Sequence, residues 1–236
     1  TSYNRFMKSI LVINDSPLLR DFLEKQLMEY GFVVIQALNG LDGWTKVRQQ
    51  TPDLIIMDYF LTRKSSMEIL KEKASDPNVA DIPVIMTSSK LDKKQVMEIA
   101  QLGVKKILSK PVRIDNLLAA LTELLQVTIE MDDTPCILDA HLNDRILFIE
   151  IAKGFNREKI NLLRYKIAEL IRIYSVSDPR ILILMTDIDF KDKDKGKLES
   201  LLLEVLEVVQ RPERIRVLSV SVPVKTFLEQ QPAIKD

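Results

Sequence analysis

The chain has 236 residues, enough for one large domain or for two ordinary ones with a hydrophobic core each. Lys and Arg together number 34, as do Asp and Glu, so the overall charge gives no indication of binding to nucleic acid or to an anionic membrane. The single cysteine, Cys136, excludes a disulfide framework within the chain and fits a reducing compartment. No apolar stretch approaches about 18 residues and no signal peptide is visible, so we expect a soluble, cytoplasmic protein.

The first half of the chain alternates apolar runs with helical patterns, after a tail over residues 1–6 that precedes Met7. This alternation predicts an α/β fold with a doubly wound parallel sheet and right-handed crossovers. The predicted strands are residues 9–13, 32–37, 54–57, 82–87 and 104–108. The predicted helices run from Ser16-Pro17 to about Gly31, and over about 40–49, 67–73, 93–102 and 113–126.

Polar residues lie at or just after the carboxyl ends of four of the predicted strands: Asp15, Asp58, Thr87 and Lys110. The carboxyl ends of parallel strands share one edge of the sheet, where such folds build their sites. Each residue alone is explained as a helix cap or loop residue, but four in register predict a functional site centred on Asp58.

The motifs at these positions resemble the receiver domain of two-component response regulators, which implies a flavodoxin-like fold over residues 7–127. The matching segments are Ile13-Asn14-Asp15-Ser16, Pro52 to Asp58, Met86-Thr87-Ser88 and Lys110-Pro111.

The resemblance implies a role for each of these residues. Asp58 would accept a phosphoryl group from a histidine kinase, Thr87 would contact that group, and Lys110 would pair with Asp58. The bond before Pro111 is commonly cis in this family. Self-directed phosphoryl transfer is the only chemistry implied, so we do not expect an enzyme acting on another substrate.

The resemblance also implies a magnesium site. Mg²⁺ prefers oxygen ligands, which Asp15, Asp58 and the backbone carbonyl of Phe60 would supply. Most relatives carry two adjacent acids where this chain has Asn14-Asp15. Asn14 can orient a water but adds no charge, so we expect weak binding of Mg²⁺, and a chain that binds none is the alternative.

Two further positions depart from the family pattern and bear on signalling. Ser66 stands where a glycine is usual, and Leu61-Thr62 replace a Met-Pro pair, which predicts an altered loop after Asp58. The aromatic switch position, three residues before the lysine, is Ile107. The sequence thus retains the phosphorylation chemistry and modifies the parts that report it.

The second half follows a linker predicted over residues 128–135 and forms a smaller mixed α/β domain over 136–236. Its pattern resembles the STAS fold of anti-sigma-factor antagonists, but Lys193 and Asp194 stand where that family carries its phosphorylated serine region, so the serine switch is lost. The predicted elements are strands 136–140, 145–152, 180–185 and 215–220 and helices 157–174, 197–209 and 224–230.

Isolated residues of the second half carry weaker indications. His141 is expected in a hairpin turn over 141–144, and Cys136 is expected to be a small core residue, because no histidine partner is identifiable. Asp187-Ile188-Asp189-Phe190 resembles a strand of diguanylate cyclases, but the Gly-Gly-acid-acid-Phe hairpin of that family is missing. No complete calcium loop is found there either.

We therefore predict a response regulator that is phosphorylated on Asp58 and controls a protein-protein interaction. Its expected partners are a sensor histidine kinase and a protein bound by the second domain, with neither nucleic acid nor membrane. A homodimer through the receiver is left open. The alternatives are a pseudo-receiver scaffold that acts without phosphorylation and, less favoured, a degenerate cyclase-like enzyme.

Overall fold

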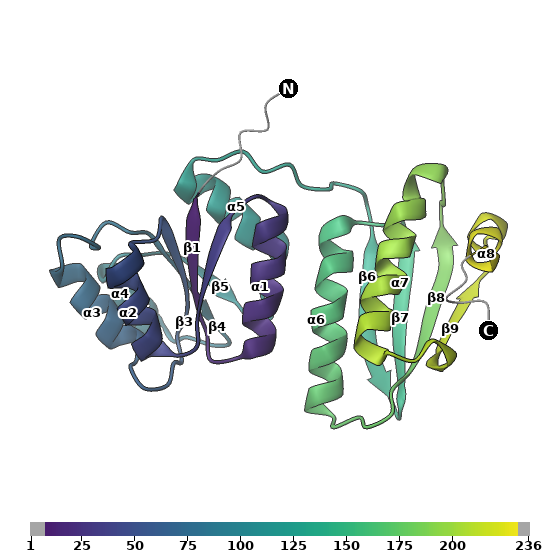
Figure 1. The fold of residues 1–236 in the computed structure, drawn as a ribbon, viewed down its shortest axis with the longest axis horizontal. Helices are drawn as coiled ribbons and strands as arrows, with labels where there is room; N and C mark the ends of the chain where they lie inside the picture. Colours follow the sequence, from purple (N-terminus) through teal and green to yellow (C-terminus); the bar gives the residue numbers. More distant parts are fainter. Residues whose placement is uncertain (1–7, 231–236) are drawn as a thin grey trace. The chain divides into compact units, whose positions relative to one another are not determined.

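The computed structural model describes residues 8–230, and its contacts divide the chain into two compact units between Glu130 and Met131. The first unit carries a five-stranded sheet and the second a four-stranded sheet (Figure 1). Within residues 8–230, no helix has the length and apolar character needed to cross a membrane.

The first unit is the predicted doubly wound α/β fold, with strand order β2-β1-β3-β4-β5 and every pair parallel. Strands and helices alternate along the whole unit, so the predicted five parallel strands are confirmed. The strands are β1 (Ser9–Ile13), β2 (Val33–Ala37), β3 (Leu54–Asp58), β4 (Val84–Ser88) and β5 (Val104–Ser109). The helices are α1 (Pro17–Glu29), α2 (Gly40–Gln50), α3 (Ser66–Ser75), α4 (Lys93–Gln101) and α5 (Ile114–Leu125).

The central strand β3 is buried along its whole length because helices cover both faces of the sheet (Figure 1). One face of β3, with Ile55 and Met57, packs on residues of α2, α3 and α4, including Val47 and Ile69. A strand buried on both faces reads as a continuous apolar run, which is why residues 54–57 carry no polar alternation.

Local signals fix the helix ends near the site. The side chain of Ser16 accepts a hydrogen bond from the backbone of Leu19, and Pro17 occupies the first turn of α1. Ser65 and Glu68 form a reciprocal capping box at the start of α3. These caps set where each strand-to-helix loop ends, and so fix the length of the loops around Asp58.

The second unit has one antiparallel and two parallel strand pairs, in the order β6-β7-β8-β9. The sheet packs one face against α6 and α7, whose leucines and isoleucines share its core (Figure 1). The elements are β6 (Ile137–Asn143), β7 (Ile146–Lys153), α6 (Arg157–Ile173), β8 (Arg180–Ile188), α7 (Lys195–Val209), β9 (Ile215–Ser219) and α8 (Val222–Glu229), with 3₁₀ turns at Asp192–Asp194 and Pro212–Arg214.

The prediction that His141 lies in a turn is wrong. His141 is in β6, opposite Phe148 of β7, and the two rings stack with their centroids 5.4 Å apart. The hairpin turns three residues later, at Asp144, whose positive φ of 53° suits a tight turn. β6 therefore takes in three of the four residues from which the turn was predicted, and each of the three pairs with a residue of β7.

The chain that precedes β6 is held to the second unit by polar contacts. Asp132 accepts hydrogen bonds from the backbone of Arg157 and Thr134 and forms an ion pair with Lys197 at 2.7 Å. Lys197 also donates to the carbonyl of Phe155. Burial alone would raise the pKa of the Asp132 carboxyl, but the hydrogen bonds from Lys197, Thr134 and Arg157 outweigh it and hold that pKa well below its usual range.

Candidate functional site

The predicted site residues converge at one edge of the first sheet. Asp58 ends β3 and lies directly beside Thr87 of β4 in the strand register, and both side chains are buried. Asp15 follows β1, and Lys110 follows β5, where its bond to Pro111 is cis. Residues separated by up to 95 positions in the sequence, from Asp15 to Lys110, therefore belong to a single cluster.

One oxygen of Asp58 is held by two side chains. Lys110 donates from Nζ to Asp58 Oδ2 at 2.5 Å, and Asn14 donates from Nδ2 to the same oxygen at 3.2 Å. The Asp58 side chain is buried, so its negative charge depends on this cation for compensation. Removing the Lys110 charge would leave a carboxylate with only an amide donor.

The second oxygen of Asp58 and one oxygen of Asp15 are buried and have no hydrogen-bond partner among the residues that the structure describes. The other oxygen of Asp15 accepts from the backbone of Thr62 at 2.9 Å. Carboxylate oxygens without a partner suit a hard cation such as Mg²⁺. Residues 8–230 contain no group of three or more His, Cys, Asp or Glu able to hold a metal ion, and the residue beside Asp15 is the amide Asn14.

Arg20 supports the site, although the sequence pattern alone did not indicate a role for it. Its guanidinium is buried, and it donates to the backbone carbonyl of Asn14 at 2.6 Å and to the side chain of Gln36 at 3.1 Å. It thereby positions the residue that donates to Asp58. The signal was a charged residue three positions before Leu23, on the apolar stripe of α1.

The loop between β3 and α3 carries Phe60 and is tied down at both ends. Ser66, at the usual glycine position, is buried and donates from its hydroxyl to the carbonyl of Tyr59 at 2.6 Å. Gly40 donates to the carbonyl of Thr62 at 3.1 Å, and a Cβ at position 40 would lie 1.7 Å from the Lys64 carbonyl oxygen. Serine thus adds a hydrogen bond that glycine could not make.

Two features link this region to its surroundings. The Tyr59 hydroxyl accepts a hydrogen bond from Gln95 of α4 at 3.1 Å, which joins the residue after Asp58 to that helix. Ile107, at the aromatic switch position, lies in β5 and is 38% exposed. An isoleucine has no ring or hydroxyl, so it cannot make the contacts of a tyrosine switch.

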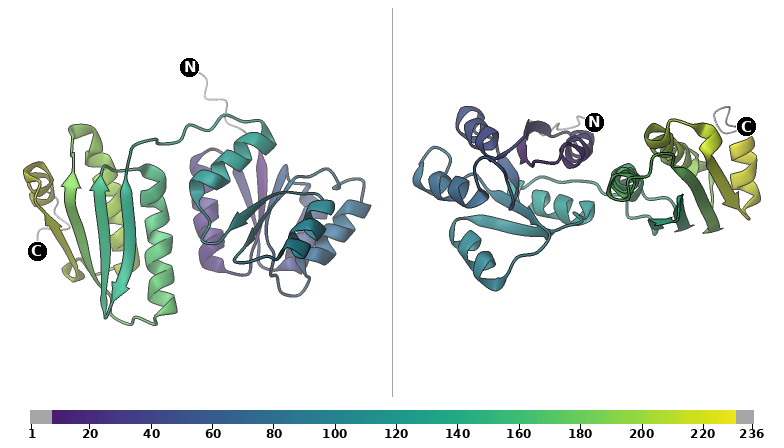
Figure 2. Two further views of the ribbon diagram at one scale, coloured as in Figure 1. Left: turned by 180° about the vertical axis from the view of Figure 1, so that it is seen from behind. Right: turned by 90° about the horizontal axis from the view of Figure 1, so that it is seen from below.

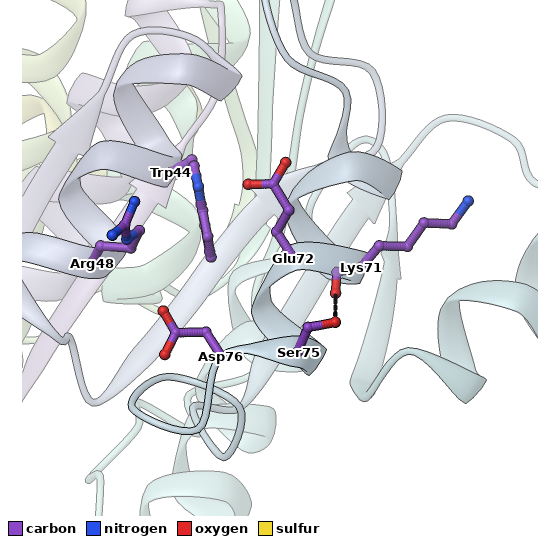
Figure 3. Close-up of a pocket in the computed structure, with 6 residues that line it drawn as sticks. All are labelled: Trp44, Arg48, Lys71, Glu72, Ser75 and Asp76. Carbon is purple, nitrogen blue, oxygen red and sulfur yellow. Dashed lines mark hydrogen bonds between the residues drawn. The ribbon is translucent and has the colours of Figure 1, made fainter.

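A separate shallow groove of about 410 Å³ lies between α2 and α3 (Figure 3). Helices in this fold run back from the strand ends, so the carboxyl-terminal residues of α2 and α3 lie toward the sheet edge opposite Asp58. The groove is therefore not part of the Asp58 site. Its lining residues are Trp44, Arg48, Lys71, Glu72, Ser75 and Asp76.

A model of the response regulator receiver domain family matches residues 10–122 of the chain. The chain is also 31% identical over 118 residues to the chemotaxis protein CheY of Bacillus subtilis, covering 49% of this chain and 96% of that protein. The chain belongs to the response regulator receiver family. Residues 10–122 are its receiver domain, and Asp15, Asp58, Thr87 and Lys110 all lie within that range.

Two longer proteins match this chain over only part of their own length. The DNA-binding dual master transcriptional regulator RpaA of Synechocystis is 30% identical over 122 residues, covering 52% of this chain and 51% of that protein. The hybrid signal transduction histidine kinase D of Dictyostelium discoideum is 33% identical over 116 residues, covering 49% of this chain and 7% of that protein.

A solved structure is also similar to the receiver chain. It is the receiver domain of the sensor histidine kinase PA1611 from Pseudomonas aeruginosa, described with a magnesium ion in its active-site cleft. It is 21% identical, covers 51% of this chain and 99% of that one, and superposes with a TM-score of 0.47.

Proposed function

We propose that this chain is a response regulator that takes a phosphoryl group from a histidine kinase onto Asp58. The observation that carries the proposal is the contact of Lys110 with Asp58 at 2.5 Å, beside Thr87 on the neighbouring strand. Phosphoryl transfer asks mainly for positioning and for compensation of the charge on the phosphoryl oxygens. The lysine cation and a threonine hydroxyl supply these at the carboxylate.

In the proposed step, a carboxylate oxygen of Asp58 forms a bond to phosphorus, and the bond from phosphorus to the kinase histidine breaks. The histidine, which carries a proton on its other ring nitrogen, keeps the electron pair of the broken bond and leaves as the neutral imidazole, and Asp58 becomes an acyl phosphate. The Lys110 cation then pairs with the phosphoryl oxygens, and the Thr87 hydroxyl donates a hydrogen bond to them. Arg20 and Asn14 keep the carboxylate in place.

Asp15, Asp58 and the backbone carbonyl of Phe60 would hold Mg²⁺, with Asn14 orienting a water. The ion, when bound, neutralises negative charge that the two carboxylates and the phosphoryl group bring together. With an amide at position 14, we expect weak binding of Mg²⁺.

Incubation with acetyl phosphate and Mg²⁺ tests the proposal. The intact mass of the full chain should rise by one phosphoryl group, and Asp58→Ala should abolish the gain. Asp53→Ala is the matched control, because Asp53 lies at the opposite end of β3 and pairs with Lys8. An adduct that persists in Asp58→Ala, or its absence even with a cognate kinase, would refute phosphorylation at Asp58.

For the second unit, we propose a STAS-like module that binds a protein partner. Its mixed sheet with helices on one face supports the proposal. Asp194 is buried and accepts from the backbone of Lys191 at 3.0 Å, so the loop before α7 is held by a carboxylate where a serine switch would stand. The output would then respond to the receiver rather than to phosphorylation of this loop.

A constitutive scaffold is the second candidate function. It is favoured by Asn14, which stands in place of an acid beside Asp15, and by Ile107 at the aromatic switch position. It makes a different prediction for the affinity of a partner captured by the second unit. A scaffold binds that partner equally in the wild type and in Asp58→Ala, whereas a response regulator binds it differently after treatment with acetyl phosphate.

A further inference from the structure

The sheet of the second unit has helices on one face only. The core residues of its strands, such as Ile149, Ile183 and Ile215, alternate in sequence with residues outside that core. Seen from the side away from α6 and α7, the strands lie in front and no helix of residues 131–230 crosses them (Figure 2). We call this side the open face.

The open face is apolar at its centre. Leu182 and Leu184 of β8 alternate with core residues, and Phe148 of β7 and Leu218 of β9 lie beside them in the register. Leu218 is 56% exposed. A strand with one solvated face normally alternates apolar and polar residues, whereas residues 181–185 of β8 are apolar on both sides. That pattern is typical of a strand covered on both faces.

Charged residues flank the apolar centre on opposite sides. Asp139 and Glu150 are directly paired across β6 and β7. Arg180 and Arg216 lie on β8 and β9, opposite Ile146 and Leu182 respectively. The four apolar residues therefore form a diagonal band, with acids on one side of it and arginines on the other.

These charges are largely uncompensated within the unit. Among residues 8–230, the side chains of Glu150 and Arg180 have no ion-pair partner. Arg216 donates to the carbonyls of Glu213 and Ile215, which are neutral acceptors. Asp139 is the exception, since Lys166 of α6 pairs with it.

We propose that the open face binds the open face of a second copy of this chain. A two-fold axis along the apolar band would bring Glu150 of one copy opposite Arg216 of the other, and Asp139 opposite Arg180. The same axis makes the strands of the two sheets cross near right angles, which is one of the two preferred ways in which sheets pack. Because the open face carries both the acids and the arginines that pair in this arrangement, it is complementary to the same face of a second copy.

A matched pair of leucine substitutions tests this dimer in the full chain. Leu218→Glu places a charge in the apolar band, and Leu203→Glu places one on α7, on the other side of the unit, where the leucine is 53% exposed. We expect sedimentation equilibrium to give a dimer for the wild type and for Leu203→Glu. Leu218→Glu should raise the dimer dissociation constant about tenfold or more, because both copies carry the change.

Charge reversal then tests the orientation. Glu150→Arg and Arg216→Glu should each weaken the dimer, and the double variant should recover most of the wild-type affinity. A monomeric wild type overturns the proposal, as does a dimer that Leu218→Glu leaves unchanged, the result expected for association through the receiver. A double variant no stronger than either single variant also overturns the proposed pairing. Asp58→Ala should dimerise like the wild type, so this test is independent of phosphorylation.

Discussion

Asn14 is the residue that most distinguishes this receiver site from the pattern of its family. Its side-chain nitrogen Nδ2 donates to Asp58 Oδ2, and its side-chain oxygen Oδ1 accepts from the backbone N–H of Ser16 at 2.8 Å. A carboxylate at this position would add charge for a cation but would repel Asp58 when no cation is bound. We therefore expect the amide to stabilise the site without a metal and to weaken the proposed binding of Mg²⁺.

Asn14→Asp should restore metal affinity. We expect the dissociation constant for Mg²⁺, measured by calorimetry, to fall about tenfold, because the site gains one negative charge close to the ion. Without Mg²⁺ the variant should unfold at a lower temperature than the wild type. Asn116→Asp adds the same charge at an exposed position of α5 and should change neither quantity. Equal Mg²⁺ affinity in the two variants would contradict this account of Asn14.

At the scale of elements, the loop between β3 and α3 is positioned by its neighbours rather than by its own sequence. The start of α2 approaches so closely that only a glycine at position 40 leaves room for the Lys64 carbonyl. Asp15 holds the middle of the loop through Thr62, and Ser66 holds its beginning through Tyr59. The loop that supplies Phe60 is thus fixed from three elements.

Gly40→Ala should therefore disrupt the loop. We expect it to lower the free energy of unfolding of the first unit by about 2 kcal/mol or more, since a buried backbone must move to admit the methyl group. Gly196→Ala is the control: no atom lies within 4 Å of the added Cβ in α7, and alanine favours helix. Urea unfolding should show the loss for Gly40→Ala and no loss for Gly196→Ala. Equal stability of the two variants would show that the loop is not tightly packed there.

At the scale of the whole molecule, the chain consists of two units with separate cores, and the Asp132 network belongs to the second. The folded-state pKa of Asp132 is lowered, so its contribution to stability is complete above its unfolded pKa of about 4. That contribution is lost as the pH falls through the lower, folded-state pKa.

Asp132→Asn should reveal this pH dependence. At neutral pH the variant should unfold in less urea than the wild type, because Lys197 loses its ion pair. The gap should narrow as the pH falls below about 4, where the Asp132 carboxyl of the unfolded wild type takes up a proton while that of the folded protein stays ionised. Asp189→Asn, at an exposed position paired with Lys191, is the control. A gap that is constant with pH would show that the charge of Asp132 does not contribute.

The sequence by itself determined the receiver fold and the membership of its site. Continuous apolar runs such as 54–57 require a strand buried on both faces, and polar residues at strand ends must gather at one sheet edge. Asp15, Asp58, Thr87 and Lys110 follow from that rule alone. The resemblance of these motifs to receiver domains then implies phosphoryl transfer.

Only the tertiary structure decided how these residues are held. Three contacts around the site join separate segments, and each depends on how closely those segments pack. They are the contacts of Arg20 with Asn14, of Thr62 with Asp15 and of Gly40 with Lys64. The prediction for His141 was wrong for the same reason, since its place in a strand depends on pairing with Phe148 of β7. Local patterns fix which elements form, whereas close packing fixes which side chains meet.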